Sequence, residues 1–151
     1  LIRWDGVNHL ERWTLVNPDG SPVSIKQTIH QIGVTEDYVV LMDTSFSTGL
    51  AQILNNPFPD NKERERILRQ LLESPPSPDS IIYIVSRSDL AKGQRPAMNE
   101  PEVKVVVRKV VIPLEASHFL VDYDNPDDKI TLHISHICAW DVAQWLRTYD
   151  L

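Results

Sequence analysis

Two stretches of the chain share one pattern of apolar and polar positions. In each, a histidine leads a short apolar run, a polar turn reverses the chain, and a second run returns. The first stretch is Thr28 to Asp43, led by His30, and the second is Ser117 to Ser135, led by His118. This pattern predicts two β-hairpins. Because a neutral imidazole is the commonest metal ligand, each hairpin begins with a candidate ligand.

Other segments predict further strands and two helices. Leu1 to Val16 predicts a third hairpin, while Ser80 to Arg87 and Val103 to Ile112 are dense in β-branched residues and each predict one strand. An amphipathic helix is predicted over Lys62 to Glu73, and Ala139 to Tyr149 can form a second helical stripe. The chain is therefore expected to be mainly β, with short helical excursions.

The order of these elements indicates an architecture. Two strands, a helix and two more strands lie between His30 and His118, after which the pattern restarts. Four strands per unit is typical of a β-propeller blade, so we expect roughly two blades of a propeller. The innermost strands of blades converge on the propeller axis, which would bring the two histidines together. A β-sandwich would contain a similar number of strands.

Composition narrows the class of protein. The chain has 151 residues and a formal charge of -6, which fits one soluble domain and argues against a nucleic-acid partner. A single cysteine, Cys138, excludes an internal disulfide and fits a reducing compartment such as the cytoplasm. No apolar run approaches the roughly 20 residues that span a bilayer. Since the chain starts at Leu1 without methionine, we expect residues 1–151 to be one segment of a longer protein.

Common catalytic and metal signatures are absent from the sequence. There is no His-Glu-x-x-His or paired Cys-x-x-Cys zinc motif, no Gly-x-Ser-x-Gly elbow and no glycine-rich phosphate loop. His9 is predicted at the surface, and His133 and His136 are interpreted as one core and one edge histidine. Four carboxylates near the second turn could suggest Ca²⁺, although tight turns also select Asp. These are Asp122, Asp124, Asp127 and Asp128.

Three segments, in order, resemble segments of the carotenoid cleavage oxygenases. His30 to Val40 resembles that family's His-Asp-Phe-x-x-Thr-x-x-x-Val-Val segment, and Ile82 to Arg87 is similar to a later strand that ends in arginine. His118 to Asp124 resembles the family's His-x-x-Asn-x-Tyr-Glu segment. The chain departs from the family at Gln31 and Ile32 (Asp-Phe in the family), Val121 (Asn) and Asp124 (Glu).

The resemblance implies a fold, a cofactor and a reaction. The family is a seven-bladed β-propeller that holds a non-haem Fe(II) with four histidines. It uses O₂ to split a conjugated carbon–carbon double bond in a carotenoid, apocarotenoid or stilbene-like substrate. His30 matches the second ligand in chain order and His118 the third, so the other two would lie before Leu1 and beyond Leu151.

Two further interpretations stay open. The chain could be a non-catalytic β-rich domain in which the histidines are packing residues. It could also be a peripheral membrane-binding module that uses Ile53, Leu54, Phe58 and the Lys62 to Glu73 helix. If the chain is instead part of a propeller, its exposed edge strands would favour pairing with another copy of the chain.

Overall fold

The computed structural model describes residues 1–44, 57–72, 77, 79–95 and 101–136. Within these residues the protein is mostly β, with one α-helix, as the sequence predicts. The strands are β1 (Ile2–Trp4), β2 (Leu10–Arg12), β3 (Thr14–Val16), β4 (Thr28–Val34), β5 (Tyr38–Thr44), β6 (Asp79–Ser86), β7 (Lys104–Val106), β8 (Arg108–Pro113), β9 (Ala116–Val121) and β10 (Leu132–His136). The helix is α2 (Lys62–Leu72), and two short 3-10 turns are η1 (Arg87–Leu90) and η2 (Pro126–Asp128).

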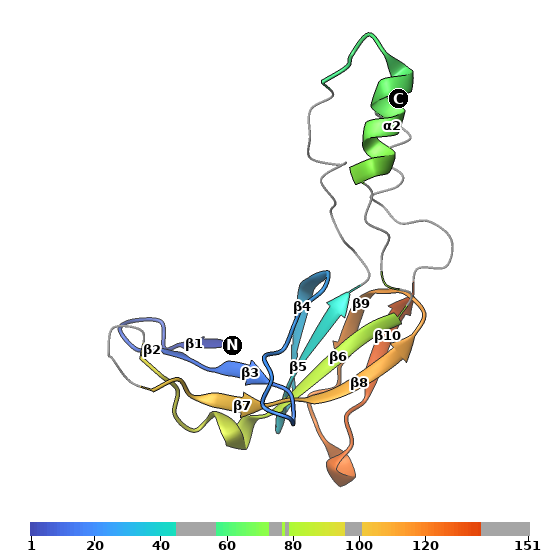
Figure 1. Cartoon of the computed structure of the whole chain (residues 1–151). Coiled ribbons are helices and arrows are strands. Elements are labelled where there is room, and N and C mark those ends of the chain that lie inside the picture. Colours follow the sequence, from blue (N-terminus) through green and yellow to red (C-terminus); the bar gives the residue numbers. More distant parts are fainter. Residues whose placement is uncertain (45–56, 73–76, 78, 96–100, 137–151) are drawn as a thin grey trace.

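A four-stranded antiparallel sheet is the centre of the fold. Its strand order is β4-β5-β6-β8, so the strands pair nearly in chain order. The β9–β10 hairpin packs on one face of this sheet, and β1, β2, β3 and β7 lie on the other side (Figure 1). Successive residues of β5 point to opposite faces of the sheet, so this strand supplies both cores.

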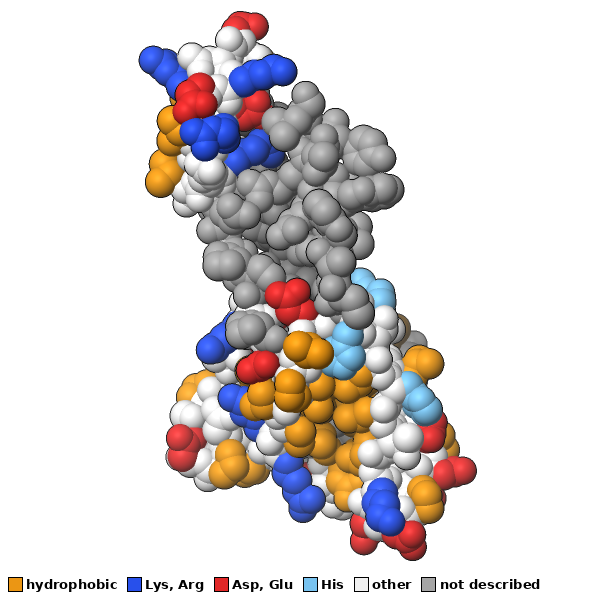
Figure 2. Space-filling view, turned by 90° about the vertical axis from the view of Figure 1, so that its right-hand side faces the viewer, with side chains coloured by type: hydrophobic (Ala, Val, Ile, Leu, Met, Phe, Trp, Pro, Cys, Tyr) orange, Lys and Arg blue, Asp and Glu red, His pale blue; other side chains and the backbone are white. Residues whose placement is uncertain are grey.

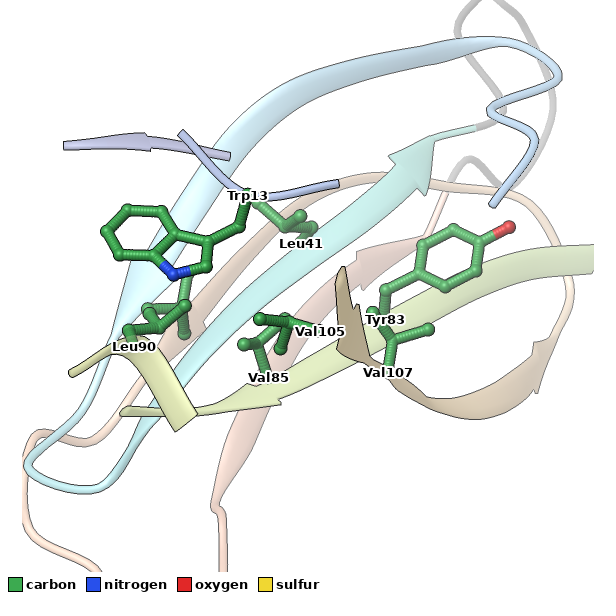
Figure 3. Packing of buried hydrophobic residues seen from close by; sticks show 8 residues of the cluster. Trp13, Leu41, Tyr83, Val85, Leu90, Val105 and Val107 are labelled. Carbon is green, nitrogen blue, oxygen red and sulfur yellow. The ribbon is translucent and has the colours of Figure 1, made fainter. Parts of the chain in front are cut away.

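The first core joins the sheet to the N-terminal strands. Val39 and Leu41 of β5 pack there with Tyr83 and Val85 of β6, and Trp13 and Val105 cover them from the other layer (Figure 3). Trp13 is only 3% exposed although it lies between two short strands. Its indole Nε1 donates to the carbonyl of Lys92, which satisfies the one polar atom of the buried ring.

The second core joins the same sheet to the β9–β10 hairpin. Val40 and Met42 of β5 and Ile82 of β6 are fully buried beneath Ala116 and Phe119 of β9. The hairpin is therefore attached to the sheet by apolar contacts, and it carries His118 along with it. This core matters for function because it determines where the second histidine lies relative to the first.

The two histidine-led hairpins form as the sequence predicts. β4 pairs with β5 across the turn at Thr35 to Asp37, and β9 pairs with β10 across a turn that contains η2. Asp127 and Asp128 have φ of 56° and 57°, in the left-handed region that turns require and that Asp tolerates. The left-handed backbone of the turn therefore explains why aspartate occupies both positions, without a Ca²⁺ site.

Two strand predictions were wrong in part. Leu1 to Val16 forms a β1–β2 hairpin, but β3 leaves it and pairs in parallel with β7. The single strand predicted over Val103 to Ile112 is divided at Val107, whose N–H donates to the carbonyl of Val16 at 2.9 Å. The chain changes partner at this residue, from β3 before it to β6 after it. Apolar periodicity cannot reveal such a change because β-branched residues occur on both sides of Val107.

The predicted helix over Lys62 to Glu73 is confirmed as α2, which projects away from the sheets (Figure 1). Asn61 caps it by accepting a hydrogen bond from the N–H of Arg64 at 3.0 Å. The predicted helix over 139–149, Cys138, Ile53 and Leu54 lie outside the described residues. None of the described helices is long and apolar enough to cross a membrane.

Candidate functional site

The two candidate ligands come together in the structure. The ring centroids of His30 and His118 lie 5.2 Å apart, with the ring planes inclined at 59°. Both side chains are exposed, His30 on β4 and His118 on β9. The contact therefore joins the leading strands of the two histidine-led hairpins at the surface.

A β-bulge directs His30 toward the second hairpin. In the β4–β5 ladder Ile29 pairs with Asp43 and Ile32 pairs with Leu41, so His30 and Gln31 together oppose the single residue Met42. One extra residue in a strand interrupts the usual alternation of side chains between faces. Two consecutive residues, His30 and Gln31, can then both reach β9, and the structure has both in contact with His118.

The second histidine also lies beside a bulge. Ser135 of β10 pairs with His118, whereas the next residue, His136, pairs with Ala116, so Ser117 is the extra residue. The bulge allows Ala116 to be fully buried against the sheet, while His118 stays exposed two residues later. Bulges of this kind often re-aim a side chain next to a functional site.

Gln31 links the two hairpins at this point. Its Oε1 accepts a hydrogen bond from the N–H of Phe119 at 3.1 Å and lies 2.9 Å from Nδ1 of His118. The side chain is half-buried, between the exposed imidazole and the apolar core below. The sequence did not single out Gln31 as a functional residue, and the only signal was its departure from the aspartate of the resembled segment.

The spacing of the two imidazoles suits one shared cation. Two imidazole nitrogens about 2.1 Å from one metal, at an angle of 90° to 110°, would put the ring centroids roughly 4.6–5.3 Å apart. The observed 5.2 Å falls in this range. Within the described residues no group of three or more His, Cys, Asp or Glu side chains is arranged to hold a metal ion. A metal site at this position would therefore need further ligands besides the two histidines.

The turn ends of the two hairpins are also tied together. Oδ1 of Asn125 accepts hydrogen bonds from the hydroxyl of Thr35 at 2.7 Å and from the N–H of Asp37 at 3.1 Å. The N–H of Glu36 donates to the carbonyl of Tyr123 at 2.8 Å. The hairpins are thus connected at both ends, by Gln31 at one and by Asn125 at the other.

Arg87 holds the same turn from the opposite side. Its guanidinium donates to the carbonyls of Thr35 and Glu36 at 2.8 and 2.7 Å, and its backbone N–H donates to the carbonyl of Asp37. Thr35 is fully buried between these partners. The first turn is therefore a junction of three segments that are far apart in the sequence, and it fixes the direction in which β4 leaves the turn.

The remaining histidines occupy other surroundings. His9 is exposed, as predicted. The expectation of one core histidine among His133 and His136 was wrong, because both are exposed on β10. Nε2 of His133 lies 2.9 Å from Oδ1 of Asp122, and Nδ1 of His136 lies 3.2 Å from the carbonyl of Glu115. The β9–β10 hairpin leaves them at the surface because Leu132 and Ile134 are the residues that face the sheet.

Apolar surface adjoins the histidines. A shallow groove of about 320 Å³ beside His118 is lined by Gln31, Phe119, Leu120, His133, Ile134 and Ser135. Leu120 is 67% exposed on its rim. Figure 2 shows imidazoles along one border of a hydrophobic patch. An apolar molecule could therefore lie on the surface next to the paired imidazoles.

A larger groove lies elsewhere in the fold. It has a volume of about 740 Å³ and is lined by residues of β1, β4, the following turn and η1, with Trp4, Ile32 and Val34 among its apolar residues. Neither His30 nor His118 lines it. This groove is therefore separate from the histidine pair.

Comparison with known proteins found no protein-family model, no curated protein and no solved structure that matches this chain.

Proposed function

We propose that His30 and His118 are two of the ligands of a non-haem Fe(II) ion in an enzyme that resembles the carotenoid cleavage oxygenases. The single observation that carries this proposal is the 5.2 Å approach of the two imidazoles, which come from separate hairpins. Histidine ligation with open coordination positions suits Fe(II). The remaining two ligands would come from outside the described residues.

The arrangement of the strands supports a propeller. An antiparallel four-stranded sheet begins with the strand that carries His30, and the next hairpin begins with the strand that carries His118. That hairpin packs face to face on the sheet through Phe119 and Met42, as the first strands of a following blade would. Under this proposal β4 and β9 are the innermost strands of neighbouring blades, and the two imidazoles point toward the axis.

The residues of this chain would have separate roles in the reaction. His30 and His118 hold the cation, and iron bound there would supply the activation of O₂ for cleavage of a conjugated carbon–carbon double bond. Phe119, Ile134 and the exposed Leu120 would support an apolar polyene or a stilbene-like molecule beside it. Such a substrate partitions into membranes, so the enzyme would make peripheral contact with a membrane. The expected compartment is the cytoplasm, which the single cysteine fits.

The test compares cation binding by the whole chain and three histidine variants. Fe(II) would be added without oxygen, and Co(II) would be used in parallel because its visible absorption reports coordination. His30→Ala and His118→Ala are each expected to weaken binding at least about tenfold, since each removes one of two ligands. His9→Ala is the matched control, because His9 is also exposed but lies in the connection between β1 and β2.

Equal affinity in the wild type and His118→Ala would overturn the proposal. It would favour the alternative, a non-catalytic β-rich domain whose histidines make only surface contacts. In the full-length protein, His118→Ala is further expected to abolish both iron content and cleavage of a polyene or stilbene. Full iron occupancy in that variant would also contradict the proposal.

A further inference from the structure

The hydrogen bonds of Gln31 determine which nitrogen of His118 carries its proton. The N–H of Phe119 donates to one terminal atom of the Gln31 amide at 3.1 Å. An amide nitrogen cannot accept this bond, so the atom must be the carbonyl oxygen, Oε1. The same oxygen lies 2.9 Å from Nδ1 of His118. Because the oxygen has no proton to donate, Nδ1 must be the donor and must be protonated.

The other nitrogen of His118 is then available as a ligand. A neutral imidazole carries one proton, so protonation at Nδ1 leaves the lone pair on Nε2. In water the opposite tautomer, with the proton on Nε2, is the more populated form of a free histidine. Gln31 therefore reverses the usual preference at this position. Hydrogen bonds of this kind orient metal-binding imidazoles and typically matter about 10–100-fold for metal affinity.

The bulge in β4 explains how Gln31 can reach the ring of His118. His30 and Gln31 both oppose Met42, so the strand presents an imidazole and an amide to β9 from adjacent positions. The amide oxygen of Gln31 also accepts a hydrogen bond from the backbone N–H of Phe119, whose ring is buried in the second core. The ring of His118 is thereby fixed to a backbone that cannot move without disturbing that core.

We infer that Gln31 is a positioning residue: it fixes His118 as the Nδ1–H tautomer and so prepares its Nε2 to bind a cation together with His30. This inference rests on the proposed function for the identity of the site. The two proposals are tested by different measurements. The proposed function is tested by cation binding, whereas the tautomer of His118 is a property of the metal-free protein and can be measured without any cation.

The first experiment measures the tautomer. The whole chain, labelled with ¹⁵N at histidine and free of metal, is examined by long-range ¹H–¹⁵N correlation NMR at about pH 8, where an ordinary imidazole is neutral. The wild type is expected to show His118 protonated at Nδ1. Gln31→Glu keeps an acceptor for both donors and is expected to keep this tautomer. Gln31→Met has a similar length but no acceptor, and is expected to show a large fraction of the Nε2–H form.

The second experiment measures Co(II) affinity of the same three proteins. Gln31→Met is expected to bind about 10–100-fold more weakly than the wild type, and Gln31→Glu is expected to restore most of the loss. In the NMR spectra of the metal-free proteins, His133 serves as an internal control. Its ring contacts Asp122 and not Gln31, so its signals should be the same in all three proteins. A general loss of folding would alter the spectra of His133 as well.

The outcomes separate the two proposals. A wild-type His118 protonated at Nε2, or an unchanged Nδ1–H tautomer in Gln31→Met, would overturn the role of Gln31 while leaving a His30–His118 cation site intact. An Nδ1–H tautomer that depends on Gln31, without any Co(II) or Fe(II) binding, would overturn the proposed function. It would reduce Gln31 to a structural link and so overturn its positioning role too.

Discussion

Gly33 of β4 lies directly against Val121 of β9. A Cβ at position 33 would be 2.8 Å from Cγ2 of Val121 and 2.9 Å from Cε2 of Phe119, closer than carbon atoms approach without a clash. Gly33 pairs with Val40 in the sheet and belongs to the face that the hairpin covers. The absence of a side chain at this one position therefore allows β9 to approach β4 closely enough for His118 to contact His30.

The first prediction concerns this close approach. Gly33→Ala is expected to lower the free energy of unfolding by about 1–3 kcal/mol, because the added methyl group overpacks the contact. Val121→Ala in the same chain should relieve part of that cost, so the double variant should be more stable than the two single effects predict. Urea unfolding of the four proteins measures the coupling. Strictly additive effects would show that the two residues do not restrict each other.

A second prediction concerns the turn end of the hairpins. Asn125→Ala removes the acceptor used by Thr35 and Asp37 and the donor to the carbonyl of Lys129, and is expected to cost roughly 1–3 kcal/mol. Asn125→Asp keeps the acceptor and should cost less. Amide hydrogen exchange of Asp37 reports the change directly. Unaltered protection of that amide in Asn125→Ala would contradict the assigned contact.

The third prediction compares a buried and an exposed position in the central sheet. Ile82 has no exposed surface, so Ile82→Ala is expected to cost about 2–5 kcal/mol, through lost burial and the cavity left behind. Val111 of β8 is 51% exposed, and Val111→Thr, which keeps the β-branched shape, should stay within about 0.5 kcal/mol. Thermal and urea unfolding would measure both. Similar losses at the two positions would be inconsistent with the second core.

A fourth prediction follows from the environment of Tyr83. Burial raises the pKa of its phenol above the ordinary value of 10.0, and the carboxylate of Asp43 raises it further. The hydroxyl donates to the carbonyl of Ser24 at 3.1 Å. Above about pH 10 the unfolded chain releases this proton more readily than the folded protein does. Ionisation of Tyr83 should therefore have no effect on stability at neutral pH, and it should lower the free energy of unfolding as the pH rises beyond about 10.

Tyr83→Phe is the matched variant for this effect. It removes the titrating group but keeps the aromatic ring in the first core, so its stability should fall less steeply between about pH 9 and pH 11. Urea midpoints of the two proteins across this range measure the difference. Parallel curves for the wild type and Tyr83→Phe would show that Tyr83 does not contribute to alkaline unfolding.

Much of the local structure could be predicted from the order of residues. The apolar runs and the polar residues between them predicted the β4–β5 and β9–β10 hairpins, and the helical pattern predicted α2. These features depend on residues close in sequence, namely the alternation of side chains and the preference of Asp, Asn and Pro for turns. The same local rules drew attention to His30 and His118, because each stands at the head of a hairpin.

Features that depend on pairing could not be predicted in this way. Nothing in the stretch around His30 reveals a bulge, because a bulge is defined by the register of β4 against β5. The division at Val107 is hidden for the same reason, since two different partner strands decide it. Asn125 was visible only as a turn residue, although its amide also holds the distant Thr35.

The amino-acid sequence by itself determined the two histidine-led hairpins, their turns and helix α2, and it singled out the two histidines to be tested, because these rest on short-range propensities and periodicity. Only the tertiary structure decided that the imidazoles of His30 and His118 meet and that Gln31 holds the second of them. The physical reason is that their contact depends on the docking of one hairpin on another sheet. That docking results from burial of Phe119, the space left at Gly33 and hydrogen bonds between distant segments.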